Sequence, residues 1–289
     1  MKKRTKMIGA ALLATSLLGA VACGGSGDEL AIGKEFIAAD TQLDALVKLD
    51  TGYADVAVID SVMAGYYMND SGSTYASKMQ VVDGLVLATE SYGIAAKKGN
   101  GALASKINEG LLLTYQTGVY ANIAETFGVT SSMALTGNEV DEYAGATDAS
   151  WANVVSSGKL VIGYTIFAPI AYEPISGAGL TGFDIELAKA VVAALNLKYE
   201  TNVEAEFVLI DWDTKEAKLQ DETLDLVWNG LTITEERQEA MTITMPYLYN
   251  KQVAIVLNED ADKYTDVDSM KDAIMTAESG SAGESVIKG

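Results

Sequence analysis

Short apolar runs alternate with helix-like apolar spacing through much of this chain. Between the runs 36–39 and 56–59, leucines recur at helical intervals over 43–49. The same alternation returns in the second half of the chain, at 160–163, 183–192, 207–210 and 224–228. This spacing predicts strand–helix–strand units, and hence α/β domains with largely parallel sheets.

One segment interrupts this alternation. Between Val129 and Ser150 the sequence is rich in Thr, Ser, Gly, Asn, Asp and Glu and has no sustained apolar period. Such a composition predicts a surface linker, here over 129–150.

The first residues predict export. Four basic residues within 2–6 precede an apolar stretch from Met7 to Val21, which is shorter than the roughly 18 residues of a spanning helix. We expect a signal peptide over 1–22 and a flexible linker over 23–27. Cys23 is the only cysteine, so no internal disulfide can form, and its place predicts the lipid-acceptor position of a bacterial lipoprotein. Ordinary cleavage after Ala22 is the alternative. In both cases the mature chain is exported, and with lipidation it is anchored at the cell surface or in the periplasm.

Composition then narrows the function. The chain has 20 basic and 40 acidic residues, a formal net charge of −20, which argues against nucleic acid as a partner. It has no histidine, and its cysteine is assigned to lipidation. No Ser-centred elbow, phosphate loop or calcium loop occurs, so we expect no enzyme, no metal and no cofactor.

Two sets of motifs carry a resemblance to a known family. The element Gly230-Leu231-Thr232-Ile233-Thr234-Glu235-Glu236-Arg237 is accompanied by segments 158–163, 182–188, 211–213 and 279–281. Together they resemble the first half of extracellular amino-acid-binding proteins of ABC importers, the bacterial solute-binding protein family 3. Segments 51–60 and 92–99, with a helix ending near Phe127, resemble the second half of that family. Because the second half comes first, we interpret the chain as a circular permutation.

The resemblance implies a two-lobe, type II periplasmic-binding-protein fold with a hinge. The first lobe would span 90–251, with the ancestral termini joined by the linker 129–150. The second lobe would combine 28–89 with 252–289. A permuted order is physically acceptable because domain termini often lie close together on the surface.

The resemblance also places a ligand site. A free amino acid presents a carboxylate and an ammonium, and a dry cleft must match both charges. Arg237 would hold the carboxylate through its bidentate fork, and Asp60 would face the ammonium. The remaining polar contacts would come from Gly230, Thr232, Ser281 and Ala282. In isolation, Arg237 would be an ordinary first-turn charge, Asp60 a helix cap for Val62 onward, and 279–282 a plain Gly/Ser loop.

Selectivity for the side chain would come from other positions. Phe167 and Trp212 match the family's aromatic walls, with Ile170 beside them, and core packing is the alternative for each. Asn229 and Glu278 fall where the family meets the ligand's side chain, although Glu278 also fits an exposed acid. Many relatives have an Asp two residues after the glycine of the first strand, and this chain has none there. We therefore expect a polar or neutral amino acid, with a basic one still open through Glu278.

These expectations combine into a function. The chain would capture an amino acid between two closing lobes, as a monomer, and deliver it to an ABC permease and its ATPase. One alternative is an amino-acid sensor that works with a membrane receptor. Another is a cyclohexadienyl dehydratase-like enzyme, in which Glu173 or Glu278 would supply the acid.

Overall fold

The computed structural model describes residues 30–69, 73–174 and 177–289. The expected signal peptide, the linker 23–27 and Cys23 lie outside the described residues. None of the helices found in the described ranges has the length and apolar character needed to cross a membrane. The strands are β1 Glu35–Ala39, β2 Val56–Asp60, β3 Met79–Val81, β4 Ala88–Lys97, β5 Lys159–Tyr164, β6 Glu204–Leu209, β7 Leu226–Thr232, β8 Met241–Ile243, β9 Leu248–Leu257 and β10 Ile274–Glu278. The helices are α1 Gln42–Asp50, α2 Ser61–Asn69, α3 Gly101–Gln116, α4 Val119–Thr126, α5 Ser150–Ser157, α6 Phe183–Tyr199, α7 Lys215–Gln220, α8 Glu235–Ala240 and α9 Ala282–Lys288.

The strands form one continuous sheet, and the α/β class is confirmed. Its order is β1-β10-β2-β9-β4-β7-β5-β6, with β3 beside β9 and β8 beside β4. Pairing is parallel toward both ends, in β1-β10-β2 and in β7-β5-β6, but antiparallel through the long central strands β4 and β9. The expectation of largely parallel sheets was therefore wrong for the middle of the sheet. In the middle, β9 pairs with β2 on one side, β4 pairs with β7 on the other, and β4 and β9 pair with each other. These two strands therefore connect the two parallel parts of the sheet.

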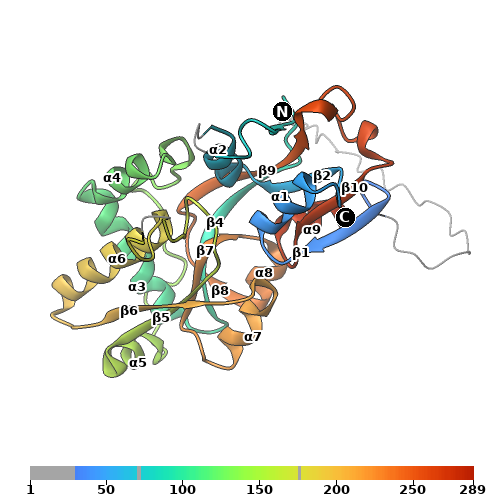
Figure 1. Cartoon of the computed structure of the whole chain (residues 1–289). Coiled ribbons are helices and arrows are strands. Elements are labelled where there is room, and N and C mark those ends of the chain that lie inside the picture. The colour runs from blue at the N-terminus through green and yellow to red at the C-terminus, as the bar shows by residue number, and fades with distance from the viewer. Residues whose placement is uncertain (1–29, 70–72, 175–176) are drawn as a thin grey trace, which may run out of the picture.

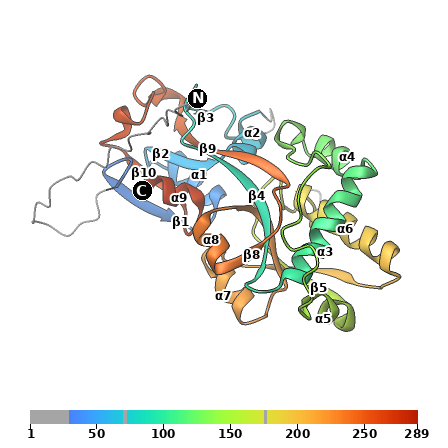
Figure 2. The ribbon, with the colours of Figure 1, turned by 180° about the vertical axis from the view of Figure 1, so that it is seen from behind.

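The two ends of the described chain meet at the same end of the sheet. In both views, the blue first strands lie beside the red last strand and helix (Figures 1 and 2). β1 and β10 pair in parallel, and the Ile32 N–H donates to the carbonyl of Ile287 at 3.1 Å. Residues almost the whole chain length apart thus build one structural unit.

Alternating side chains divide the core between the two faces of the sheet. Ala57 and Ile59 of β2 pack into the largest apolar cluster, which also takes Leu226 and Trp228 of β7. Val58 packs into a second cluster on the other face, and Val227 into a third. The period-two pattern of a strand produces this division. β2 is buried on both faces, which explains why its sequence is an uninterrupted apolar run.

The segment 129–150 lies largely at the surface, as predicted, but it is hydrogen-bonded to the rest of the molecule. It has one short 3-10 turn, Thr130–Ser132, and begins no longer element until α5. However, the Ala134 N–H donates to the Tyr247 carbonyl at 3.3 Å, and Asp141 accepts from Ser105 at 2.6 Å. The Asp141 side chain thus ties the segment to α3, and the Ala134 backbone ties it to Tyr247, just before β9.

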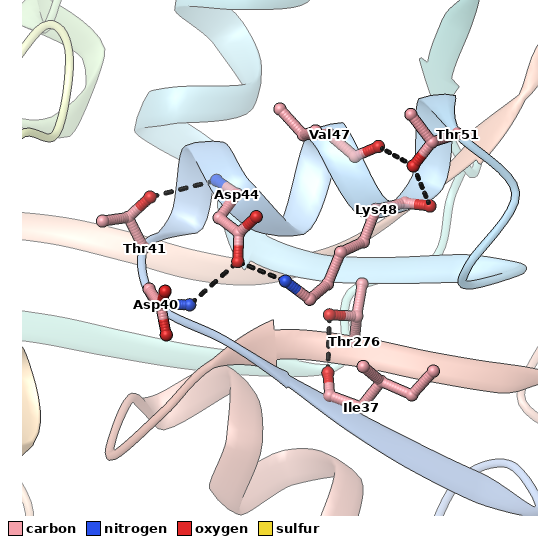
Figure 3. A network of polar contacts seen from close by, with 8 residues as sticks. All are labelled: Ile37, Asp40, Thr41, Asp44, Val47, Lys48, Thr51 and Thr276. Atoms are coloured by element: carbon pink, nitrogen blue, oxygen red, sulfur yellow. Dashed lines mark hydrogen bonds and ion pairs between the residues drawn. The ribbon is translucent and has the colours of Figure 1, made fainter.

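Helix α1 is fixed at its start by a polar network (Figure 3). The Thr41 hydroxyl accepts from the Asp44 N–H at 3.0 Å, and the Asp44 carboxylate accepts from the Asp40 N–H at 3.0 Å and pairs with Lys48. These contacts satisfy amides that a helix start leaves open. They also fix the position of Gln42, the first residue of the helix.

Candidate functional site

Ten of the eleven predicted ligand residues line one small cavity. The cavity measures about 10 Å³, room for about one water molecule, and lies between the two ends of the sheet. Its lining is Gln42, Asp60, Thr165, Phe167, Trp212, Asn229, Gly230, Thr232, Arg237, Glu278, Ser281 and Ala282. The described conformation is therefore closed, and an amino acid can enter only if these walls separate.

Arg237 is a buried cation that bridges the two ends of the sheet. It belongs to α8, and its guanidinium donates to the carbonyls of Thr232 at 2.9 Å and Gly280 at 3.1 Å. The Arg237 backbone N–H donates to the Thr234 hydroxyl at 3.1 Å, so Thr234 caps the first turn of α8. Only 8% of Arg237 is exposed, so it is not an ordinary solvated charge of a helix start. Burial lowers its pKa, but guanidinium remains charged.

Lys215 is a second cation that the sequence interpretation missed. It opens α7, and its ammonium donates to the carbonyls of Trp212 at 3.2 Å and Gly280 at 3.3 Å. It lies 4.9 Å from the centre of the Trp212 ring. Burial and, to a smaller extent, the nearby charge of Arg237 lower its pKa to about 8. Two cations therefore converge on the Gly280 carbonyl, beside a groove of about 860 Å³ that shares Arg237 with the cavity.

Asp60 ends β2 and is held by amide side chains. It accepts from Gln42, from Asn250 and, at 2.6 Å, from Gln252. The Asn250 side chain also accepts from the Val62 N–H at 3.3 Å, so the amide that Asp60 could have capped is already paired. Burial raises the pKa of Asp60 well above its usual range, and the charge of Glu90 raises it further. A ligand ammonium beside Asp60 would favour its ionised form.

Glu278 ends β10 and is the other buried acid of the cavity. Among the described residues its Oε1 has no hydrogen-bond partner. Burial raises its pKa to about 8, because the opposing attraction of Lys215 is weaker than the loss of solvation. Glu278 is therefore not an exposed acid. Across the cavity, the Asn229 amide is hydrogen-bonded to the Thr165 hydroxyl at 2.8 Å.

The predicted aromatic walls lie at the cavity, and their predicted companion does not. Phe167 and Trp212 line it, with 3% and 6% of their surfaces exposed. Ile170 lies outside this lining and is fully buried in the largest apolar cluster, so core packing describes it. Its backbone explains the position, because the Asp184 N–H donates to the Ile170 carbonyl at 3.0 Å and holds the residue against the start of α6.

The turn after β10 brings Ser281 and Ala282 to the cavity. The Ser281 hydroxyl accepts from the Glu284 N–H at 3.2 Å and caps α9, and the Gly280 N–H donates to the Glu284 carboxylate at 2.5 Å. These two reciprocal hydrogen bonds cap the N-terminus of α9, so the turn is not a plain Gly/Ser loop.

Gln42 and Thr165 line the cavity without having been predicted. Gln42 follows β1, Asp60 ends β2 and Glu278 ends β10, and these strands are parallel neighbours. The carboxyl ends of parallel strands share one edge, where ligands of α/β proteins bind. The strand order could therefore have predicted that Gln42 lies at the cavity. Thr165 follows β5 at the corresponding edge of the other end of the sheet.

Comparison with known proteins matches one part of the chain. Residues 160–279 match the model of the bacterial extracellular solute-binding proteins, family 3. A probable amino-acid-binding protein of Bacillus subtilis, YxeM, is 31% identical over 113 residues, 39% of each chain. A probable histidine-binding protein of Neisseria gonorrhoeae is 34% identical over 91 residues, 31% of each chain. A cyclohexadienyl dehydratase of Pseudomonas aeruginosa is 23% identical over 133 residues, covering 46% of this chain and 47% of the enzyme.

The matches named here each cover only part of this chain. This chain spans between 31% and 51% of the length of these curated relatives. Among solved structures, a histidine-bound ABC uptake transporter substrate-binding protein of Streptococcus pneumoniae is 34% identical. That likeness covers 32% of this chain and 35% of the other, with a TM-score of 0.27. Over residues 160–279, the chain is similar to the bacterial extracellular solute-binding proteins of family 3.

Proposed function

We propose that this protein binds a polar or neutral free amino acid between two lobes and delivers it to an ABC permease. The observation that carries the proposal is the cavity, where buried Arg237 and buried Asp60 line the same space. A buried cation and a buried carboxyl group in one cavity suit a zwitterion, because the ligand carboxylate would pair with Arg237 and the ligand ammonium would favour the ionised form of Asp60. Glu278 and Asn229 would meet the ligand's side chain, and Phe167 and Trp212 its apolar part.

The proposed lobes span 90–251 and 28–89 with 252–289. The hydrogen bonds from Arg237 and Lys215 to Gly280 cross between these lobes, and β4 and β9 would form the hinge. A ligand carboxylate placed between Arg237 and the start of α9 would favour closure. Circular permutation is supported by the parallel pairing of β1 with β10, which joins both chain ends in one lobe.

The proposal extends to the cell surface and to partners. Export over 1–22 and lipidation at Cys23 would hold a monomer near the permease and its ATPase. Palmitate labelling of cells that express the full chain tests the anchor: label should enter the wild type and not Cys23→Ser.

A thermal-shift screen of residues 24–289 against the twenty amino acids and cystine tests the binding function. A ligand that binds only the folded state raises the Tm, and ligand at 100 times its Kd adds about 2.7 kcal/mol. We expect a shift with one or a few polar or neutral amino acids, and none with Arg237→Met. No shift with any of them would overturn the proposal.

A second candidate is supported by one observation. Glu278 is a buried carboxyl group with a raised pKa in the cavity, as a general acid requires, and one partial relative is named a cyclohexadienyl dehydratase. Turnover of a cyclohexadienyl acid that Glu278→Gln abolishes would favour this enzyme over a binding protein.

A further inference from the structure

Asp184 is a buried acid that the proposed binding chemistry leaves unused. It is the second residue of α6, and only 1% of it is exposed. Its Oδ2 accepts from the Tyr247 hydroxyl at 2.7 Å and from the Gly230 N–H at 2.8 Å. Among the described residues, its Oδ1 has no hydrogen-bond partner and no cation forms an ion pair with it.

Gly230 needs such a partner because β7 bulges there. Leu231 pairs with Gly93 and Val227 with Ala95, so the single residue Ile94 faces three residues of β7. A bulge removes N–H groups from the ladder, and a buried unpaired N–H is costly. The Asp184 carboxylate accepts the Gly230 N–H at 2.8 Å in place of the missing strand partner, and the Tyr247 hydroxyl accepts it more weakly at 3.3 Å.

The bulge also explains why position 230 is glycine. Its φ is +62°, and a Cβ would lie 2.7 Å from the Phe167 ring and 3.1 Å from that of Tyr92. A residue without a side chain lets the backbone itself form the cavity wall. The orientation of this peptide is then set by what holds its N–H.

We propose that Asp184 is a positioning residue for ligand recognition: it fixes the Gly230 peptide so that its backbone faces the ligand ammonium. This inference rests on the proposed amino-acid binding. Asp184 does not line the cavity, so it acts through Gly230. Its buried charge also adds a negative potential behind the ammonium position.

The surroundings of Asp184 allow its protonation state to be measured. Burial raises its pKa to about 7, against the opposing hydrogen bonds from Tyr247 and Gly230. The titratable groups that face it are the phenols of Tyr247 and, from α4, Tyr120. Burial raises the pKa of Tyr120 to about 12 and that of Tyr247 well above its usual range, so neither titrates between pH 6 and 8.

The first measurement follows the Gly230 amide proton by NMR in the ligand-free wild type. A proton donated to Asp184 should shift with pH, with a midpoint near 7. In Asp184→Asn that pH dependence should vanish. A Gly230 amide that does not respond to pH anywhere in the range in which the wild type stays folded would overturn the inference without any ligand, and without depending on how well the variant folds.

The second measurement compares the affinity for L-glutamine with that for glutaramate, which is glutamine without its α-amino group. The same comparison is made for L-histidine and its deaminated analogue, imidazolepropionate. Asp184→Asn should weaken amino-acid binding about tenfold and binding of the deaminated analogue less than about twofold. Asp225→Asn is the matched control, because Asp225 also accepts a strand N–H, from Val161 at 2.8 Å, next to the far end of β7. It should leave the ratio of the two affinities unchanged.

The outcomes separate the two proposals. If Asp184→Asn weakens binding of the amino acid and of its deaminated analogue by the same factor, the positioning role is overturned and amino-acid binding still stands. If the wild type binds none of the twenty amino acids, the proposed function fails and this inference fails with it.

Discussion

Replacement of Arg237 by methionine should weaken ligand binding strongly and spare the fold. The guanidinium is buried, donates to two carbonyls, and has no carboxylate within 4 Å among the described residues. Methionine keeps the unbranched apolar stem and removes the charge. The ligand carboxylate would then lie in a dry site without its partner.

The magnitude follows from this geometry. Truncation of one partner of a buried, hydrogen-bonded charge pair costs about 2–5 kcal/mol, or roughly 30- to 4,000-fold in Kd. For the free protein, the loss of two charged hydrogen bonds costs about 3–6 kcal/mol, while removal of an unpaired buried charge returns several kcal/mol. The repulsion of Lys215 also disappears. We expect the free energy of unfolding without ligand to change by less than about 2 kcal/mol.

Two assays on the same variant test this reasoning. Titration calorimetry with the amino acid found in the thermal-shift screen should show the loss of affinity, and urea unfolding without ligand should show near-normal stability. Lys189→Met is the matched control, because Lys189 forms only an exposed pair with Glu186 and such pairs contribute little. A Kd that rises less than about tenfold in Arg237→Met would refute its role as the carboxylate clamp. Poor stability together with normal affinity would show that Arg237 is structural.

Three further predictions concern the acids and the surface segment. Burial and Glu90 raise the pKa of Asp60, so Asp60→Asn should stabilise the ligand-free protein at neutral pH and weaken amino-acid binding, as urea unfolding and calorimetry would show; lower stability would contradict this. Glu278 holds its proton up to pH about 8 when folded and only to about 4.5 when unfolded, so its contribution to stability falls as pH rises from 4.5 to 8. Glu278→Gln should flatten that part of the stability–pH curve, and an unchanged slope would count against the buried acid. A glutamate-specific protease should cut first at Glu139 or Glu142, and ligand binding should persist. The reason is that both sides of the cut stay hydrogen-bonded to the rest of the molecule, Ala134 to Tyr247 and Asp148 to Ala102. Loss of binding would show that the intact segment is required.

The sequence predicted elements and site residues wherever local pattern and family motif agreed. Asp60 and Glu278 could be placed at the cavity because they stand where the family motifs put ligand residues, and Arg237 because its distance from Gly230 matches a known motif. Lys215 could not be found this way. Its pattern is that of a solvated first helical turn, and its burial depends on the turn of β10 and α9 from the other end of the sheet.

The antiparallel centre of the sheet and the anchoring of 129–150 escaped prediction for the same reason. Apolar periodicity reports which residues are buried, but it does not report strand direction. β4 and β9 therefore read like any other strand until their pairing is seen. Asp141 likewise reads as a loop acid, and only the fold brings Ser105 and Asn108 within 2.6 and 2.7 Å of it.

The protonation states of the groups at and beside the cavity give one further test of the proposed binding of a zwitterion. Asp60 and Glu278 have raised pKa values and Lys215 a lowered one, each chiefly through burial. Each group is thus pushed toward neutrality in the ligand-free, closed form. A zwitterion between Arg237 and Asp60 supplies the missing counter-charges, so binding should draw a proton off Asp60. Calorimetry in buffers of different ionisation enthalpy would detect that release; heats that do not depend on the buffer near neutral pH would mean that Asp60 is already ionised before the ligand arrives.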